Sequence, residues 1–299
     1  MDVVSIKLAS QNVQDDWAAR LVAQGWFGPD ADLLNTSDSS DTEVAIKEAY
    51  IQIHIPVGSG IGLKAGVFDT VIGYEATDRA DNPFYSHSWG YTVEPTQHTG
   101  FMFDYTFSND LTTYFGIANT TSPKINGLAD NDNNFTLIGA LEYQVPENIF
   151  LLGNSTITTG VVEGRPWDAG LNDQPIVREE YYYLGIKGIK TPIEDLTLGT
   201  AWDIRVNRGA GKNDDQVLGA YLQYDATNLL EFNLRAERFE AGSGLGSSMS
   251  DGWGTTVGGT YKLWHNTQAR FEYRYDKTDL PVSGKRGNKA LIWNLIYAF

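Results

Sequence analysis

Charged side chains recur at every second position in several stretches of this chain. Arg270, Glu272 and Arg274 alternate with Phe271 and Tyr273. In a strand this spacing places the charges on one face and the aromatic rings on the other. Opposed charges around a water-filled space create a field that orients ions and polar solutes. The predicted set that faces such a space is Lys187, Asp203, Arg205, Glu231, Arg235, Glu237, Arg270, Glu272 and Arg274.

Signals for catalysis and for metal binding are weak. Of the four histidines, His54 and His98 fall on the polar face of their strands but are far apart in sequence, and no ligand spacing supports a metal site. Ser86 directly precedes His87, which prevents a simple nucleophile–base contact, and no G-x-S-x-G elbow occurs. We therefore expect no enzyme, no metal and no cofactor. Calcium at acidic loop segments is an open alternative at 30–32, 130–134 and 213–215.

Period-two alternation predicts an all-β chain. In 96–107 the side chains of Phe101, Phe103 and Tyr105 face away from Met102 and Asp104. Fifteen segments are predicted as strands: 2–10, 15–25, 43–55, 60–69, 96–107, 111–119, 135–145, 148–159, 179–190, 195–206, 216–225, 229–240, 252–264, 267–276 and 289–299. The segment 148–159 alternates poorly.

The predicted connections alternate between short and long. Short turns at 56–59, 108–110, 146–147 and 226–228 alternate with long loops such as 70–95, 160–178 and 277–288. Short turns at one end and long loops at the other are typical of transmembrane antiparallel barrels, with the turns periplasmic and the loops extracellular. We therefore predict one β-barrel domain over 1–299, with about sixteen strands. A barrel of that width is too wide for side chains to fill and should hold water.

The outer face of the predicted strands fits a membrane. Tyr and Trp recur near strand ends, as the interfaces of a bilayer require. The last strand carries Leu291, Trp293, Leu295, Tyr297 and Phe299 on one face, and a terminal Phe preceded by Tyr resembles the C-terminal signature of bacterial outer-membrane barrels. The sequence therefore predicts outer-membrane lipid as the surroundings.

Composition excludes other classes of protein. The 299 residues include 31 Gly and no Cys, and the formal net charge is −16. No basic stripe is available to neutralise phosphates, so nucleic acid is not an expected partner. Mean hydropathy is −0.30, and no apolar run approaches the length of a membrane helix. We expect the targeting segment, and one upward strand that would make the count even, to precede Met1. A wrongly predicted strand at 15–25 or 148–159 is the other explanation of the odd count.

The longest predicted connection, 70–95, is the candidate constriction. Its candidate site residues are Glu75, Asp78, Asp81, Tyr85 and His87. If this loop folds into the barrel, its carboxylates would face the basic residues of the wall. If it lies outside, over the mouth, the hypothesis fails.

A family resemblance supports this reading. The stretch 48–58, followed by 62–68, 72–75, 82–86 and 94–100, resembles the OmpL-like β-barrel porin family. The resemblance implies a bacterial outer-membrane porin, a passive channel for small hydrophilic solutes and ions. It names no solute. A homotrimer is compatible with a barrel of this width.

Two alternatives stay open at this point. One is a plugged structural or adhesion barrel whose acidic loops bind a partner, and the other is a sleeve around another protein. Continuity of the water path past 70–95 distinguishes them from a pore. The sign of the preferred ion is also open, because net acidity favours cations while the wall arginines favour anions.

Overall fold

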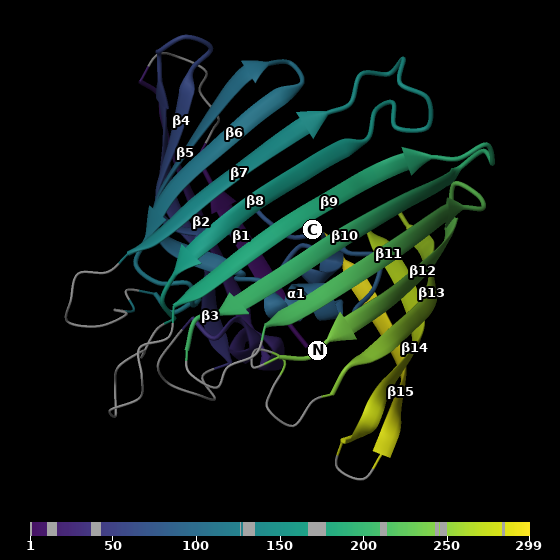
Figure 1. The fold of residues 1–299 in the computed structure, drawn as a ribbon. Helices are drawn as coiled ribbons and strands as arrows, with labels where there is room; N and C mark the ends of the chain where they lie inside the picture. The colour runs from purple at the N-terminus through teal and green to yellow at the C-terminus, as the bar shows by residue number, and fades with distance from the viewer. Residues whose placement is uncertain are drawn as a thin grey trace.

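In the part of the chain that the structure describes, fifteen strands form a single antiparallel sheet in the order of the chain (Figure 1). The computed structural model describes residues 2–10, 17–36, 43–125, 127, 135–166, 178–209, 214–242, 245, 250–282 and 285–299. The strands are β1 (Val4–Ala9), β2 (Ala19–Phe27), β3 (Val44–Ile55), β4 (Ile61–Asp69), β5 (Gln97–Ser108), β6 (Leu111–Ala118), β7 (Thr136–Gln144), β8 (Thr156–Gly164), β9 (Glu179–Lys190), β10 (Leu196–Asn207), β11 (Asp215–Asp225), β12 (Leu230–Glu240), β13 (Gly252–Trp264), β14 (Thr267–Val282) and β15 (Lys285–Tyr297).

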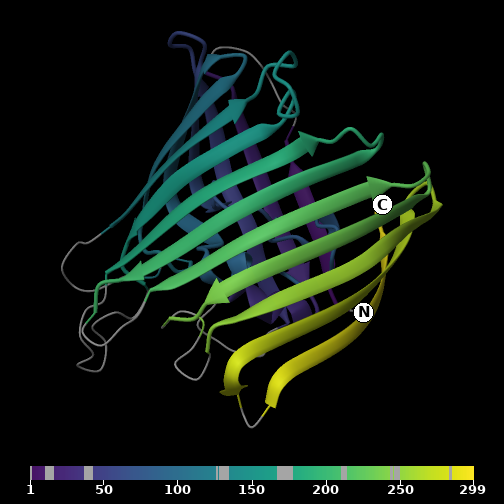
Figure 2. The same ribbon diagram turned by 45° about the vertical axis from the view of Figure 1, so that its right-hand side comes forward.

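The sheet curls around an interior that contains the short helix α1 (Trp89–Val93), as Figures 1 and 2 show. Two 3-10 helices, η1 (Pro29–Leu34) and η2 (Arg79–Asp81), lie in the connections β2–β3 and β4–β5. Each strand pairs with the next one in sequence, and β1 and β15 are the two ends of the described strand order. We call the side that faces α1 the inner face.

The two faces of the sheet are inverted relative to a soluble β-sandwich. Large apolar side chains are exposed on the outer face, among them Phe101, Leu184 and Trp293. Charged side chains are buried on the inner face, among them Arg235 and Glu272. In water this arrangement would be costly, because buried charge needs partners and exposed apolar surface needs cover. Lipid outside and polar groups inside remove both problems.

Each of the fifteen predicted strand segments corresponds to a strand in the described part of the chain, with errors in two places, and the sixteenth strand stays a prediction. The predicted strand 148–159 is observed as β8 over Thr156–Gly164. Residues 145–155 form turns instead, with Leu151 and Asn154 in the left-handed region and the Gly153 amide donating to the Ile149 carbonyl. That connection is therefore longer than the short turn predicted at 146–147.

The predicted long loop at 277–288 is mostly strand. β14 continues to Val282 and β15 begins at Lys285, so only 283–284 lies between them. A break in register between Lys277 and Val282 accompanies Pro281, which has no backbone N–H to donate to a ladder. Elsewhere the long connections lie at the end predicted for them, and the longest is 70–96, between β4 and β5.

None of the helices in the described part of the chain combines the length and the apolarity needed to cross a bilayer.

Arginine in place of Leu184 tests the outer face. Leu184 lies in the middle of β9 and its side chain is exposed. In a bilayer, Leu184→Arg should lower the free energy of unfolding by about 2–4 kcal/mol, because the charge would lie in hydrocarbon. Chemical denaturation in lipid vesicles measures this. Lys187→Arg, on the same strand, is the control and should change little. Equal effects would contradict a lipid-facing outer surface at Leu184.

Candidate functional site: the segment inside the sheet

The connection 70–96 crosses the interior of the sheet. It leaves β4, forms η2 and α1, and returns at β5. Between these ends it contacts strands on the opposite part of the wall, since α1 packs against β10 and β11 and other residues bond to β12 and β14. The residues that the sequence placed on a loop and those it placed on the wall thus meet in space.

Arg235 is the principal contact between wall and loop. Its side chain is fully buried and donates to Glu75 Oε1 at 2.7 Å and to the Ser86 carbonyl at 2.8 Å. Its Nε lies 3.0 Å from Glu237 Oε2, and its guanidinium lies 5.1 Å from the centre of the Phe84 ring. One cation thus holds two carboxylates and the loop backbone.

Glu75 is held ionised in this arrangement. Burial alone would raise the pKa of this carboxyl group. The charge of Arg235, nearby His87 and a hydrogen bond from the Ser88 amide outweigh burial, and together they lower the pKa of Glu75 to about 2. His87 Nδ1 lies 3.4 Å from Glu75 Oε2, and its ring stacks on Tyr91 with centroids 3.7 Å apart.

The carboxylates of β12 and β14 bind the loop backbone. Glu272 accepts from the Tyr85 amide at 2.7 Å, and Glu237 accepts from the Trp89 amide at 2.6 Å. Asp276 accepts from the Trp89 indole N–H at 2.9 Å. Amides in an irregular segment need such acceptors, because burial without a partner is costly. These side chains therefore fix the path of residues 85–89.

The arginines of β14 donate to loop carbonyls. Arg270 donates to the carbonyls of Asn82 and Arg79, the latter at 3.0 Å. Arg274 donates to the His87 carbonyl at 2.5 Å and lies over the Trp89 ring. Sequence alternation placed both on the inner face, but their partners are backbone groups that no residue-type pattern reveals.

A second set of contacts joins the loop to β9, β10 and β11. Tyr74 stacks on Tyr221 with ring centroids 3.7 Å apart, and Lys187 Nζ lies 4.8 Å from the centre of the Tyr74 ring. The carboxyl groups of Glu94 and Asp203 are buried neighbours that interact electrostatically. Burial, followed by the neighbouring charge of Asp203, raises the pKa of Glu94 well above its ordinary value. The Glu94 carboxyl group therefore favours its protonated form.

The acidic tip of the loop lies near η1. Tyr85 Oη donates to Asp30 at 3.0 Å, and Arg79 lies 3.3 Å from the same carboxylate. Asp78 caps η2 by accepting from the Ala80 amide, and it also accepts from Gln24 at 3.4 Å. Asp81 is exposed to solvent. The partial burial of its carboxyl group, followed by the charge of Asp78, raises the pKa of Asp81. Of the predicted loop residues, Asp81 is thus the one most open to solvent.

Two predicted wall residues stand apart from the loop. Arg205 pairs with Glu179 and lies over the Tyr181 ring. Glu231 accepts from Asn233 at 2.7 Å and from Gln223 at 3.3 Å. Neither has a described bond to residues 70–96, so the predicted set divides into loop contacts and wall-only contacts.

Three charged residues on the other part of the inner face, Lys64, Asp104 and Glu142, lie outside the predicted set, to which Lys187 belongs. Lys64, Asp104 and Glu142 keep partial exposure, and Lys187 is exposed. We call these four residues the open wall; they lie on β4, β5, β7 and β9. Alternation in 96–107 already placed Asp104 on the polar face, but β4 and β7 each carry too few charges for a ladder to stand out.

Cavities border the segment 70–96, and another lies on the wall apart from it. One of about 530 Å³ is lined by Trp89, Arg274 and Arg286. Another of about 270 Å³ is lined by Tyr74, Lys187 and Tyr221. A third, of about 440 Å³ and near the short turns, includes Arg20 and Asp104.

The predicted calcium segments are only partly described. Residues 130–134 lie outside the described residues, as does Asn213. Asp215 accepts from the Gly242 and Leu245 amides at 2.7 and 3.0 Å, and Asp30 bonds to Arg79 and Tyr85. Within the described ranges, no group of three or more His or acidic residues is placed to hold a metal ion. Calcium binding stays a prediction.

Removal of Arg235 tests its role as an anchor. Arg235→Met leaves Glu75 and Glu237 without their cation and should lower the free energy of unfolding by about 3–5 kcal/mol. Adding Glu75→Gln and Glu237→Gln should recover much of the loss. Arg238→Met, on the outer face of the same strand, removes a solvent-exposed ion pair and should cost about 0–1 kcal/mol. Chemical denaturation in vesicles measures all three. Similar costs for Arg235 and Arg238 would refute the anchor.

The raised pKa of Glu94 predicts that the stability of the folded protein depends on pH. Because its pKa is raised in the folded protein, its contribution to stability is present below the ordinary value of 4.5 and is lost as pH rises through the raised pKa. Unfolding measured from about pH 4 to about pH 8 should show a smaller loss of stability in Glu94→Gln than in the parent chain. Glu43→Gln, an exposed residue of another connection, is the control. An unchanged pH profile in Glu94→Gln would contradict the assignment.

Known structures share this architecture. The OmpF porin of Salmonella typhi, in complex with daunomycin, is similar with a TM-score of 0.69 at 13% identity, covering 98% of this chain and 89% of that one. An anion-selective porin from Comamonas acidovorans has a TM-score of 0.64 at 12% identity, covering 99% and 89%. The outer-membrane channel DcaP of Acinetobacter baumannii has a TM-score of 0.62 at 9% identity, covering 99% of this chain and 84% of that one. These similarities establish the porin-type barrel fold.

The sequence comparison reaches further than the fold. No curated protein sequence matches the chain. A family model described as "Putative beta-barrel porin-2, OmpL-like" matches residues 2–299, almost the whole chain. Together with the inverted faces of the sheet, this match confirms the barrel, the outer-membrane location and the channel function that the sequence predicted. The chain belongs to the OmpL-like β-barrel porin-2 family of outer-membrane porins.

Proposed function

We propose that this porin is a passive channel for small hydrophilic solutes and ions whose narrowest part is formed by residues 70–95. One observation carries the proposal. The segment connects β4 to β5, but it bonds to the distant strands β12 and β14 through Arg235, Glu237 and Glu272. A segment held across the interior reduces the space through which solutes pass. Multiple charged hydrogen bonds keep it in place.

The solute path runs beside the open wall in this proposal. Arg235 and Arg270 are 0% and 5% exposed, and both bond to the loop. They therefore act as anchors, and the predicted arginine ladder contributes few free charges to the pore. Lys64, Asp104, Glu142 and Lys187 lie on strands β4 to β9, away from these anchors, and remain accessible.

The free charges of the path have both signs. Lys64 on β4 and Lys187 on β9 flank Asp104 on β5 and Glu142 on β7, and Asp81 is exposed at the tip of the loop. Mixed charges favour polar and zwitterionic solutes and disfavour apolar ones. The Comamonas porin is named as anion-selective. With both signs on its path, we expect weaker ion selectivity for this chain.

The proposal also covers the oligomeric state and the absence of an assigned catalytic step. OmpT of Vibrio cholerae, which is similar to this chain with a TM-score of 0.64 at 12% identity, was solved in a trimer form. A homotrimer is accordingly our expectation here. We assign no catalytic step, because a channel fold and family account for the polar interior without one.

Cysteine accessibility tests the path directly, since the native chain has no cysteine. Lys187→Cys places a thiol on the open wall, and Thr256→Cys places one beneath Arg235, where Thr256 is 1% exposed. A negatively charged thiosulfonate should lower single-channel conductance of Lys187→Cys by roughly a half, because it adds bulk and reverses a charge in the path. Conductance of Thr256→Cys should stay constant.

Either of two results would contradict the proposal. Equal modification of both thiols would mean that residues 70–95 do not cover Arg235 in the membrane. A folded chain without any conductance would favour the plugged barrel that binds a partner through its loops.

A further inference from the structure

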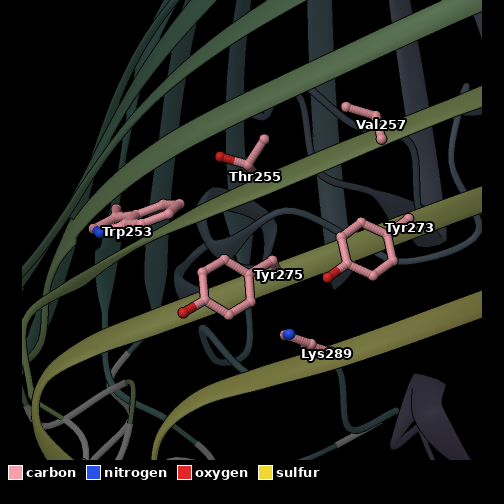
Figure 3. Close-up of a pocket in the computed structure, with 6 residues that line it drawn as sticks. All are labelled: Trp253, Thr255, Val257, Tyr273, Tyr275 and Lys289. Atoms are coloured by element: carbon pink, nitrogen blue, oxygen red, sulfur yellow. The ribbon is translucent and has the colours of Figure 1, made fainter.

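An aromatic hollow lies on the outer face of the last three strands (Figure 3). Its volume is about 450 Å³, and its lining is Trp253, Thr255 and Val257 of β13, Tyr273 and Tyr275 of β14, and Lys289 of β15. These residues alternate with inner-face residues such as Thr256, Glu272 and Arg274. The hollow therefore opens toward the surrounding membrane and is separate from the solute path.

Small residues create the hollow. Thr255 stands opposite Tyr275 in the β13–β14 pairing, and Gly287 stands opposite Lys277 in the β14–β15 pairing. Around them the rings are ordered, since Trp253 and Tyr275 meet edge to face with centroids 5.4 Å apart. A Cβ added at Gly287 would lie 3.1 Å from the Tyr275 hydroxyl. Fixed rings beside small residues leave a permanent depression.

Two lysines stand at one end of this hollow. Lys289 pairs with Tyr275 across β14 and β15 and lies 5.8 Å from the centre of its ring. Lys277, two residues further along β14, is a diagonal neighbour on the same face. Both are exposed, and neither ammonium group has a carboxylate partner among the described residues. The nearby carboxylate Asp279 pairs with Arg238 at 3.2 Å.

The hollow is positively charged at one end and apolar toward the other, which matches the headgroup and acyl chain of a lipid. The lysines lie toward the end where β13 begins and β14 ends, which is the end of the long connections. Toward the middle of the strands come Val257 and Tyr273, followed by Phe271 and Trp293. A headgroup anion would meet two cations and aromatic hydroxyls, while its acyl chain would lie along apolar side chains.

We propose that this hollow binds a phosphorylated, acylated glycolipid of the outer leaflet. The charge of the two lysines calls for an anionic headgroup, and the apolar continuation calls for an acyl chain. The long-connection end of the barrel meets the outer leaflet, so the lipid is of the lipid A type. A second copy of the chain is the competing occupant, but two uncompensated lysines on each copy would repel.

Native mass spectrometry of the folded protein in detergent tests this, with bisphosphorylated lipid A as the probe. The parent chain should retain the lipid, while Lys277→Gln with Lys289→Gln should raise the apparent dissociation constant about tenfold. Thr255→Phe should also weaken binding, because it fills the hollow without changing charge. Lys190→Gln with Lys262→Gln, which removes two exposed lysines at the short-turn ends of β9 and β13, is the charge-matched control and should bind as the parent does.

Two further measurements, with a neutral lipid and of single-channel conductance, serve as controls for the binding experiment. Phosphatidylcholine, which has no net charge, should bind equally to parent and double variant. Single-channel conductance of every variant should equal that of the parent, which shows that the barrel is folded. Equal lipid A binding by parent and double variant would overturn the proposal. Loss of a subunit contact in the double variant without loss of lipid A would also overturn it.

Discussion

Hydrocarbon cannot hydrogen-bond to a peptide group, and this constraint governs the whole molecule. Every strand from β2 to β14 pairs on both sides, so the backbone polar groups of the wall find partners within the sheet. Side chains on the two faces of the sheet then meet opposite surroundings, lipid outside and polar groups inside. Leucine, phenylalanine and tryptophan suit the lipid, while charged groups such as Arg235 and Glu272 are placed inside, where they find partners. A chain of average polarity can therefore be a membrane protein.

The interior has its own requirement, because buried charge must be paired. Arg235 is surrounded by Glu75, Glu237 and the carbonyls of Ser86 and His87. Glu272 and Arg270 repeat the pattern with amides and carbonyls of the same loop. An irregular segment without a ladder of its own gains its hydrogen bonds from the wall, and the wall charges gain partners from the segment. Each explains the presence of the other.

This reciprocity changes the meaning of charges on the inner face. A charged residue predicted to face water can instead be an anchor, as Arg235 is. A less conspicuous residue such as Lys187 can keep its exposure. Function then depends on which part of the wall the segment covers. The exposed lysines of the outer face, Lys277 and Lys289, show that charge outside the barrel also has a place, provided that it lies near a strand end.

The sequence by itself determined the strands, their two faces and the family. Strand pairing between neighbours is local, and alternation of side chains survives in any register of that pairing, so periodicity predicted nearly all of the fifteen strands. It failed at 148–159, where the backbone forms turns that include Leu151 and Asn154 in the left-handed region, and at 277–288, where strands continue past Pro281. Side-chain periodicity does not report either feature.

Only the tertiary structure decided the path of residues 70–95. Glu75 and Arg235 are separated by 160 positions, and their contact depends on how far the sheet has curled before β12 is reached. The acceptors of the Trp89 and Tyr85 amides, and the carbonyls bound by Arg270, are backbone contacts to which residue types give no clue. Curvature and irregular backbone are properties of the assembled wall, and they separate anchors from accessible charges.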